Sequence, residues 1–220
     1  MSLPKTWASQ RKKEYYYRKA KEEEYRSRAT YKLLQAVEKY HFIKKGDIVV
    51  DLGAAPGGWL QATRGIVGKE GFILGVDLKE IAPLNEKNIF TIVSDIVNPE
   101  TDRLIKNILP SLADVVVSDV SPRVSGIWEI DHARQVSLAR KSLVIALKVL
   151  RANGNFFVKA FQGDMFKDFF EDVRKYFLNV KIAKPKASRP KSSEIFVLGR
   201  GFLGTCDTGL ECKRDNTSSK

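Results

Sequence analysis

A glycine-rich loop and two carboxylates after predicted strands are the residues best placed to bind a nucleotide. The loop, residues 51–59, reads DLGAAPGGW and follows a short apolar run. Glycines let a backbone turn sharply and approach a ligand closely. Asp77 ends the next apolar run, about twenty residues after the glycines, where a carboxylate can accept hydrogen bonds from both hydroxyls of an adenosine ribose. Asp95, after the third apolar run, is placed to meet the adenine edge.

The glycine spacing separates this loop from a dinucleotide-binding loop. The pattern is G-x-x-x-G-G rather than G-x-G-x-x-G, so the loop is less suited to a pyrophosphate on a helix N-terminus. Each acid taken alone could be an ordinary loop residue or a helix cap. Three acids at strand ends around one glycine loop make a nucleotide site the better interpretation.

Strands and helices alternate along the chain and must position these residues. The apolar and periodic segments predict strands over 48–51, 72–76, 89–93, 114–118, 155–158, 180–183 and 195–198, and helices over 29–39, 59–67, 101–108, 131–150 and 164–176. Asn153-Gly154 should end the fourth of these helices. Such alternation predicts an α/β fold with a mostly parallel seven-stranded sheet and helices on both faces.

The topology predicts which residues share an edge of this sheet. About ten residues join the last two strands, fewer than a parallel crossover needs, so the last strand should be antiparallel. Ligands of open sheets bind at the carboxyl ends of the parallel strands. The first, second, fourth and fifth strands then end on one edge, and Glu194, at the start of the last strand, lies there too.

The charge distribution predicts a polyanionic partner. The 220 residues carry a net charge of +12, with a pI near 9.6, a balance typical of nucleic-acid-binding proteins. Residues 1–45 hold 13 Lys or Arg and 5 Glu, and thus +8 of the total. A second cluster comprises Lys184, Lys186, Arg189 and Lys191. A solvated surface would explain such clusters equally simply, but two clusters flanking a more balanced domain favour RNA binding.

Several segments together resemble a known family. The loop 51–59 is similar to the S-adenosylmethionine loop of the FtsJ/RrmJ-type (RlmE family) ribose 2′-O-methyltransferases of ribosomal RNA. The stretches RSRATYKL at 26–33, SDVSP at 118–122, FVK at 157–159 and SSE at 192–194 also match it, so that the resemblance covers about residues 15–200. It implies a Rossmann-like methyltransferase fold, S-adenosylmethionine as the cofactor and an RNA substrate.

The resemblance also implies which residues form the site. A catalytic quartet would comprise Lys32, Asp119, Lys159 and Glu194. The cofactor contacts would be Gly57, Trp59, Asp77, Asp95 and Asp119, and we add Arg26 and Arg28 to the second basic cluster as expected RNA contacts. A ribose hydroxyl is a weak acid, so its methylation needs a base or a nearby cation. A lysine serves as a base only if its pKa falls from about 10.4 towards 7–8, and Lys159, after an apolar strand run, is our candidate.

The RNA substrate stays open at this point. Bacterial and archaeal members of the family methylate a uridine of large-subunit (23S) ribosomal RNA, which is our first interpretation, and eukaryotic relatives act on tRNA anticodon loops. The tyrosine-rich basic run YYYRKAK at 15–21 is closer to the second group. A non-catalytic RNA-binding module and a small-molecule methyltransferase are further alternatives. The intact quartet argues against the former, and the basic clusters argue against the latter.

The remaining expectations concern organisation and surroundings. We expect a basic N-terminal arm, helical or partly ordered, over 1–25, a methyltransferase domain over 26–200 and a loose tail over 201–220. No apolar run reaches the ~18 residues of a membrane span, and no apolar stretch resembles a signal peptide, which favours a cytoplasmic location. Cys206 and Cys212 are interpreted as plain thiols, and we expect a monomer without a metal ion.

Overall fold

A seven-stranded mixed sheet forms the centre of the molecule in the computed structural model, which describes residues 5–189 and 192–204. The strand order is β3-β2-β1-β4-β5-β7-β6. The strands are β1 (Ile48–Leu52), β2 (Phe72–Asp77), β3 (Ile89–Val93), β4 (Ala113–Ser118), β5 (Leu150–Phe161), β6 (Phe177–Ala183) and β7 (Glu194–Phe202). The first five strands pair in parallel, and β7 runs antiparallel to both neighbours, β5 and β6. The predicted α/β fold and antiparallel last strand are confirmed.

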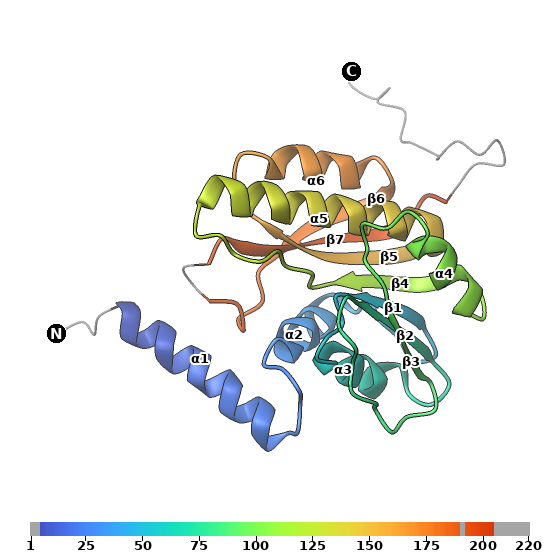
Figure 1. The fold of residues 1–220 in the computed structure, drawn as a ribbon, viewed down its shortest axis with the longest axis horizontal. Coiled ribbons are helices and arrows are strands. Elements are labelled where there is room, and N and C mark those ends of the chain that lie inside the picture. The colour runs from blue at the N-terminus through green and yellow to red at the C-terminus, as the bar shows by residue number, and fades with distance from the viewer. Residues whose placement is uncertain (1–4, 190–191, 205–220) are drawn as a thin grey trace.

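Helices cover both faces of the sheet (Figure 1). They are α1 (Lys5–Glu22), α2 (Thr30–Tyr40), α3 (Gly58–Val67), α4 (Thr101–Ile108), α5 (Trp128–Val149) and α6 (Phe166–Arg174). One core joins α4, α5 and α6 to one face, and the other joins α2 and α3 to the opposite face. The central strands are apolar and buried on both faces, as parallel strands covered by helices must be. None of the described helices is long and apolar enough to cross a membrane.

The register of the strands brings the predicted site residues to one edge. Leu52 of β1 pairs with Ser118 of β4, and Ser118 pairs with Val158 of β5. Phe161, the last residue of β5, pairs with Glu194, the first residue of β7. The residues that follow β1, β2 and β4 therefore meet the end of β5 and the start of β7 at one edge, as expected.

Two boundaries differ from the sequence-based prediction. Helix α5 ends at Val149, one residue before the predicted end, because Leu150 has extended dihedral angles (φ −73°, ψ 141°); the predicted stop Asn153-Gly154 lies within β5, which starts at Leu150 rather than at residue 155. The register of the pairing of β5 with β4 shifts between Ala113 and Val115. Strand β7 continues to Phe202, which packs against the Phe177 ring at 5.6 Å, so the expected loose tail cannot start at 201. The rest of that tail, with both cysteines, lies outside the described residues.

Helix α1 reaches beyond the sheet and is attached to it by a small aromatic cluster (Figure 1). Tyr16 is 9% exposed and packs with Tyr31 of α2 and with Ala187. Gln35 Nε2 donates a hydrogen bond to the Tyr16 hydroxyl, and Gln35 Oε1 accepts one from the backbone of Ala187. One face of α1 is thereby fixed against α2 and the β6–β7 connection, while Tyr17 on the same helix stays exposed.

Candidate active site at the carboxyl edge of the sheet

The glycine loop turns tightly between β1 and α3. Gly53 has a φ of +81°, and a Cβ atom there would lie 2.5 Å from Val120 Cγ2, so a larger residue does not fit. Asp77, at the end of β2, holds the loop, since one of its carboxylate oxygens accepts a hydrogen bond from Ala55 N at 2.9 Å. Its other oxygen accepts one from Lys79 N. Asp77 thus joins the glycine loop to the end of β2, and its contact with a ribose stays a prediction.

Gly57 and Trp59, two further predicted cofactor contacts, also have clear structural partners. Gly57 has a φ of +107°, and a Cβ there would lie 3.1 Å from Nη1 of Arg26. Trp59 is only 4% exposed, lies against Phe157 and Phe196, and donates its indole N–H to the carbonyl of residue 29. Trp59 therefore supports the loop from the core, and a direct cofactor contact by its side chain stays a prediction.

Asp51, the first residue of the glycine loop, is a buried carboxyl that lacks a hydrogen-bond partner among the described residues. It is 1% exposed, and no described residue donates a hydrogen bond to either of its carboxylate oxygens. Burial, followed by the charges of Asp119 and Asp77, raises the pKa of Asp51 well above its usual range. A buried carboxyl without a partner is costly. The ammonium group of the methionine part of S-adenosylmethionine is a suitable partner, so the residues present fit this cofactor.

Asp95 follows β3 and shapes the next turn. One carboxylate oxygen accepts a hydrogen bond from Val97 N at 2.9 Å, and its backbone carbonyl accepts one from the Thr101 hydroxyl. This is the local capping role that acids often have after strands. The expected contact with adenine stays a prediction.

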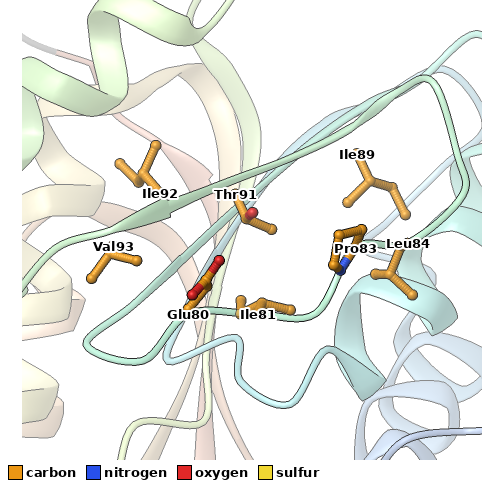
Figure 2. A pocket seen from close by; sticks show the side chains of 8 residues that line it. All are labelled: Glu80, Ile81, Pro83, Leu84, Ile89, Thr91, Ile92 and Val93. Atoms are coloured by element: carbon orange, nitrogen blue, oxygen red, sulfur yellow. The ribbon is translucent and has the colours of Figure 1, made fainter.

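A cavity of about 350 Å³ lies beside the edge strand β3 (Figure 2). Its walls come from β3 and from the connection that precedes it: Glu80, Ile81, Pro83, Leu84, Ile89, Thr91, Ile92 and Val93. Arg26 fixes one wall by donating hydrogen bonds to the carbonyls of Ala82 and Pro83. None of the lining residues belongs to the glycine loop or to the predicted quartet, so this cavity is separate from both.

The four predicted catalytic residues meet in one chain of ion pairs. Lys32 Nζ lies 2.7 Å from Glu194 Oε2 and 3.7 Å from Asp119 Oδ2. Asp119 Oδ1 lies 3.0 Å from Lys159 Nζ. The side chains are between 4% and 17% exposed. Because Asp119 stands between two lysines, each ammonium has a carboxylate partner, and the buried charges compensate one another.

Lys159 Nζ has three oxygen neighbours. It donates hydrogen bonds to the backbone carbonyl of Asp119 at 2.6 Å and to the Ser121 hydroxyl, and the Asp119 carboxylate is the third neighbour. Ser121 lies in the exposed β4–α5 loop, whereas Asp119 is half-buried. Gln135 Nε2 donates to the Lys159 carbonyl and thereby ties the strand end to α5. The amine is positioned from several sides, as a reacting group must be.

The predicted RNA-contact residues fall into three groups. Arg28 and Arg189 lie near the quartet: burial first, and Arg189 second, lower the pKa of Arg28, while Glu194 and Asp119 oppose that shift. Lys184 and Lys186 are exposed, and Lys184 donates to the Ser192 carbonyl. The guanidinium of Arg26 is bound to backbone carbonyls at the glycine loop and the 82–83 segment. Lys191 lies outside the described residues.

Two residues of the site escaped the sequence analysis, and Asp51, the third of the acids at strand ends, was given no role there. Ser121 stands two residues after Asp119, but nothing in its spacing distinguishes it from an ordinary loop serine. Ser188, whose hydroxyl donates to Glu194 Oε1 at 2.9 Å, lies in the basic loop and becomes visible only through the fold. Among the described residues, no group of three or more His, Cys, Asp or Glu side chains could hold a metal ion.

The chain is similar to several named proteins over nearly its whole length. Residues 25–202 match the FtsJ-like methyltransferase family. A ribosomal RNA large subunit methyltransferase E from Methanococcus aeolicus is 51% identical over 91% of this chain and 74% of its own length. One from Methanocaldococcus jannaschii is 46% identical over 91% of this chain and 83% of its own length.

Solved structures agree with these sequence matches. A crystal structure from Plasmodium falciparum, described as a ribosomal RNA methyltransferase, superimposes with a TM-score of 0.73 at 28% identity, over 82% of this chain and 100% of that one. The fibrillarin pre-rRNA processing protein of Methanococcus jannaschii shares the fold, with a TM-score of 0.57 at 18% identity over 80% and 76% of the two chains. The chain thus belongs to the FtsJ-like methyltransferases, a family of S-adenosylmethionine-dependent enzymes.

Proposed function

We propose that this enzyme transfers a methyl group from S-adenosylmethionine to the 2′-hydroxyl of a ribose, that of a uridine in large-subunit (23S) ribosomal RNA. The relatives named as ribosomal RNA large subunit methyltransferase E, at about half of all positions identical, support the substrate. The observation that carries the proposal is the buried chain of ion pairs from Lys159 through Asp119 to Lys32 and Glu194. An amine oriented by a carboxylate, at the same edge of the sheet as the glycine loop, supports this proposal.

The cofactor is held by the carboxyl edge of the sheet. Asp51 would bind its ammonium group, Asp77 its ribose and Asp95 its adenine, while Gly57 leaves room for close approach. When bound, S-adenosylmethionine supplies a methyl group on a positively charged sulfur, which is already activated for transfer. The protein therefore has to exclude water, align the acceptor oxygen and remove its proton.

Lys159 accepts that proton at Nζ as a neutral amine, after its ammonium form has released a proton to solvent. Its three oxygen neighbours hold the amine in place, and the Ser121 hydroxyl is the one among them that lies in an exposed loop. The ribose hydroxyl can take the place of this serine contact and then faces Nζ directly. Asp119 keeps the amine oriented, and Lys32, paired with Glu194, compensates the charge of Asp119 on its other side. Ser188 fixes the second oxygen of Glu194.

The RNA reaches this edge between two basic segments. Arg28, just before Lys32 in the chain, and Arg189, just before Glu194, are close enough for each to affect the other. Two neighbouring guanidinium groups beside a catalytic ribose suit phosphates of the RNA backbone, which supply affinity without sequence choice. The exposed Lys184 and Lys186 extend this surface along the same connection. The arm of residues 1–25 adds further positive charge next to the domain of residues 26–200.

Methylation of total RNA with labelled cofactor, followed by mapping of the modified nucleotide, tests this proposal. The expected product is one 2′-O-methyluridine in large-subunit RNA, and the Lys159→Met variant should give none above background. Label in the anticodon loop of tRNA would show that tRNA, the alternative substrate, is methylated instead of ribosomal RNA. Cofactor binding without label in any RNA would contradict the enzymatic role altogether. An enzyme of ribosomal RNA works where ribosomes are assembled, so we also propose a cytoplasmic location.

A further inference from the structure

We infer that Trp128 is a stacking platform for an unpaired base of the RNA substrate, next to the catalytic quartet. This inference rests on the proposed function and adds a residue that positions the substrate. Trp128 is the first residue of α5, and 45% of its surface is exposed. Its ring lies nearly parallel to that of His132, with the centroids 5.4 Å apart, and to that of Phe161, at 6.0 Å.

The histidine behind Trp128 is held rigidly. His132 is 4% exposed, and its Nε2 accepts a hydrogen bond from Met165 N at 3.2 Å. Gly163 approaches so closely that a Cβ atom there would lie 2.7 Å from His132 Cε1. The backbone of the β5–α6 connection therefore fixes the ring on which Trp128 stacks.

The loop that leads to Trp128 is also fixed. Asp131 accepts hydrogen bonds from Ser125 N at 2.7 Å, from the Ser125 hydroxyl at 2.8 Å and from Gly126 N at 3.1 Å. These bonds, the one from the Ser125 backbone foremost, lower the pKa of the Asp131 carboxyl. An indole ring on a preformed support loses little freedom when a base stacks on it, which favours binding.

The platform lies within one nucleotide of the reacting amine. Phe161 and Lys159 are two residues apart on β5, so their side chains leave the same face of the strand, about 7 Å apart. Phe161 also pairs in register with Glu194. Phe161, which stacks with Trp128, therefore lies beside two members of the quartet, Lys159 and Glu194. A nucleotide whose ribose lies at Lys159, or its neighbour in an unpaired stretch, can place its base on Trp128.

The chemistry of the surface favours a nucleobase as the occupant. Exposed aromatic rings bind unpaired bases by stacking and tolerate any sequence. Val124, Ile127 and Ile130 are also exposed in this region, so an apolar protein partner is the competing occupant. Arg123, in the loop before Trp128, and Arg134, on the same helix, are both exposed, and the charge of Arg134 acts on Asp131. Exposed cations on the loop and helix that carry an exposed aromatic ring match a polyanion with unpaired bases.

Tryptophan fluorescence with a 12-nucleotide oligouridine tests the platform directly. The wild-type emission should be quenched by oligouridine and not by an abasic ribose–phosphate oligomer of equal length and charge. All spectra are recorded in a Trp7→Phe background, so that Trp59 and Trp128 are the two remaining tryptophans. Trp128→Phe should then lose this quenching, since Trp59 is buried in the core. In Trp128→Ala, affinity for oligouridine should fall by about 5- to 100-fold, the loss expected for one stacked base. Trp128→Phe should retain most of the affinity, and the matched control Val124→Ala, in the same loop, should retain all of it.

Other outcomes would overturn the inference. Equal quenching in wild type and Trp128→Phe would remove Trp128 from RNA binding. Equal losses of affinity in Trp128→Ala and Val124→Ala would indicate general apolar contact rather than stacking. Unchanged RNA affinity together with lost self-association in sedimentation would assign the patch to a protein partner. Methyl transfer to ribosomal RNA is measured separately: wild-type quenching without transfer contradicts the proposed function alone, and transfer unaffected in Trp128→Ala contradicts the platform alone. Cofactor affinity and Tm confirm that each variant is folded.

Discussion

Replacing Lys159 by methionine should abolish most turnover while leaving the cofactor site intact. Methionine retains much of the length and apolar volume of the lysine stem but can neither accept nor donate a proton. Loss of a general base lowers turnover by roughly 10²–10⁴-fold, which corresponds to about 2.7–5.5 kcal/mol of transition-state stabilisation. Neither Asp51 nor Asp77 contacts Lys159, so cofactor affinity should change less than about threefold, well under 1 kcal/mol.

The same substitution has a cost in stability that must be separated from catalysis. Lys159 is 4% exposed, and breaking a buried ion pair by removing one partner costs about 3–5 kcal/mol. The actual loss should lie near or below the lower figure, because Asp119 keeps Lys32 at 3.7 Å and is 17% exposed. Chemical denaturation gives this loss, and turnover is then measured at a temperature where the variant is fully folded. Lys175→Met, which removes an exposed ion pair with Asp172 on α6, is the matched control.

Arginine at the same position separates two roles of the lysine. A guanidinium keeps the positive charge but does not give up its proton under these conditions. If Lys159 takes the ribose proton, Lys159→Arg should be as inactive as Lys159→Met. Single-turnover methyl transfer, with cofactor affinity from calorimetry, provides the measurement. Activity of Lys159→Arg within tenfold of wild type would refute the proton-accepting role and leave Lys159 as a cation beside the reacting oxygen.

Three further predictions concern other parts of the site. Burial raises the pKa of Asp51. The contribution of Asp51 to the free energy of unfolding is therefore complete below its unfolded pKa of about 3.9 and is lost as pH rises through the folded pKa. In chemical denaturation without cofactor, Asp51→Asn should become increasingly more stable than wild type from pH 4 to 8. Gly53→Ala, with a φ of +81° and a valine methyl 2.5 Å from the new Cβ, should lower the free energy of unfolding by roughly 2–4 kcal/mol, whereas Gly65→Ala, in open space on α3, should not lower it. In Arg28→Ala/Arg189→Ala, a plot of log RNA affinity against log salt should flatten by about 1.5, and an unchanged slope would exclude phosphate contacts by this pair.

Much of the fold follows from the pattern of the sequence because the sheet is covered on both sides. Buried parallel strands appear as continuous apolar runs, and β3 and α4 begin and end where the pattern predicts. The short link before β7 was enough to predict its antiparallel direction. The start of β5 was predicted five residues too late because Asn153-Gly154 looks like a helix stop that separates a helix from a strand. These residues instead lie within β5, near the register shift of its pairing with β4, which depends on tertiary pairing.

The site was only partly predictable because long-range geometry decides which polar groups meet. The order of Lys32, Asp119, Lys159 and Glu194 was visible through the family resemblance, and the structure brings all four together. The charge pattern alone could not show that Arg26 binds backbone carbonyls while Arg28, two residues later, faces the quartet. The side chains of these two arginines, just before α2, point in different directions, and the amino-acid composition carries no information about those directions.

On the proposed mechanism, the arrangement of charge separates chemistry from RNA affinity. Inside the edge, two ammonium groups face two carboxylates before the reaction, so the resting quartet carries no net charge and can remain mostly buried; it carries −1 once Lys159 has released the proton that makes it a base. The excess positive charge lies outside it, on Arg28, Arg189 and the exposed lysines of the β6–β7 connection. A reaction that moves a proton and a cationic methyl donor in one pocket benefits from this neutrality, since a net positive quartet would repel the sulfonium. Changes on the rim should therefore alter KM and its salt dependence, and changes in the quartet should alter kcat.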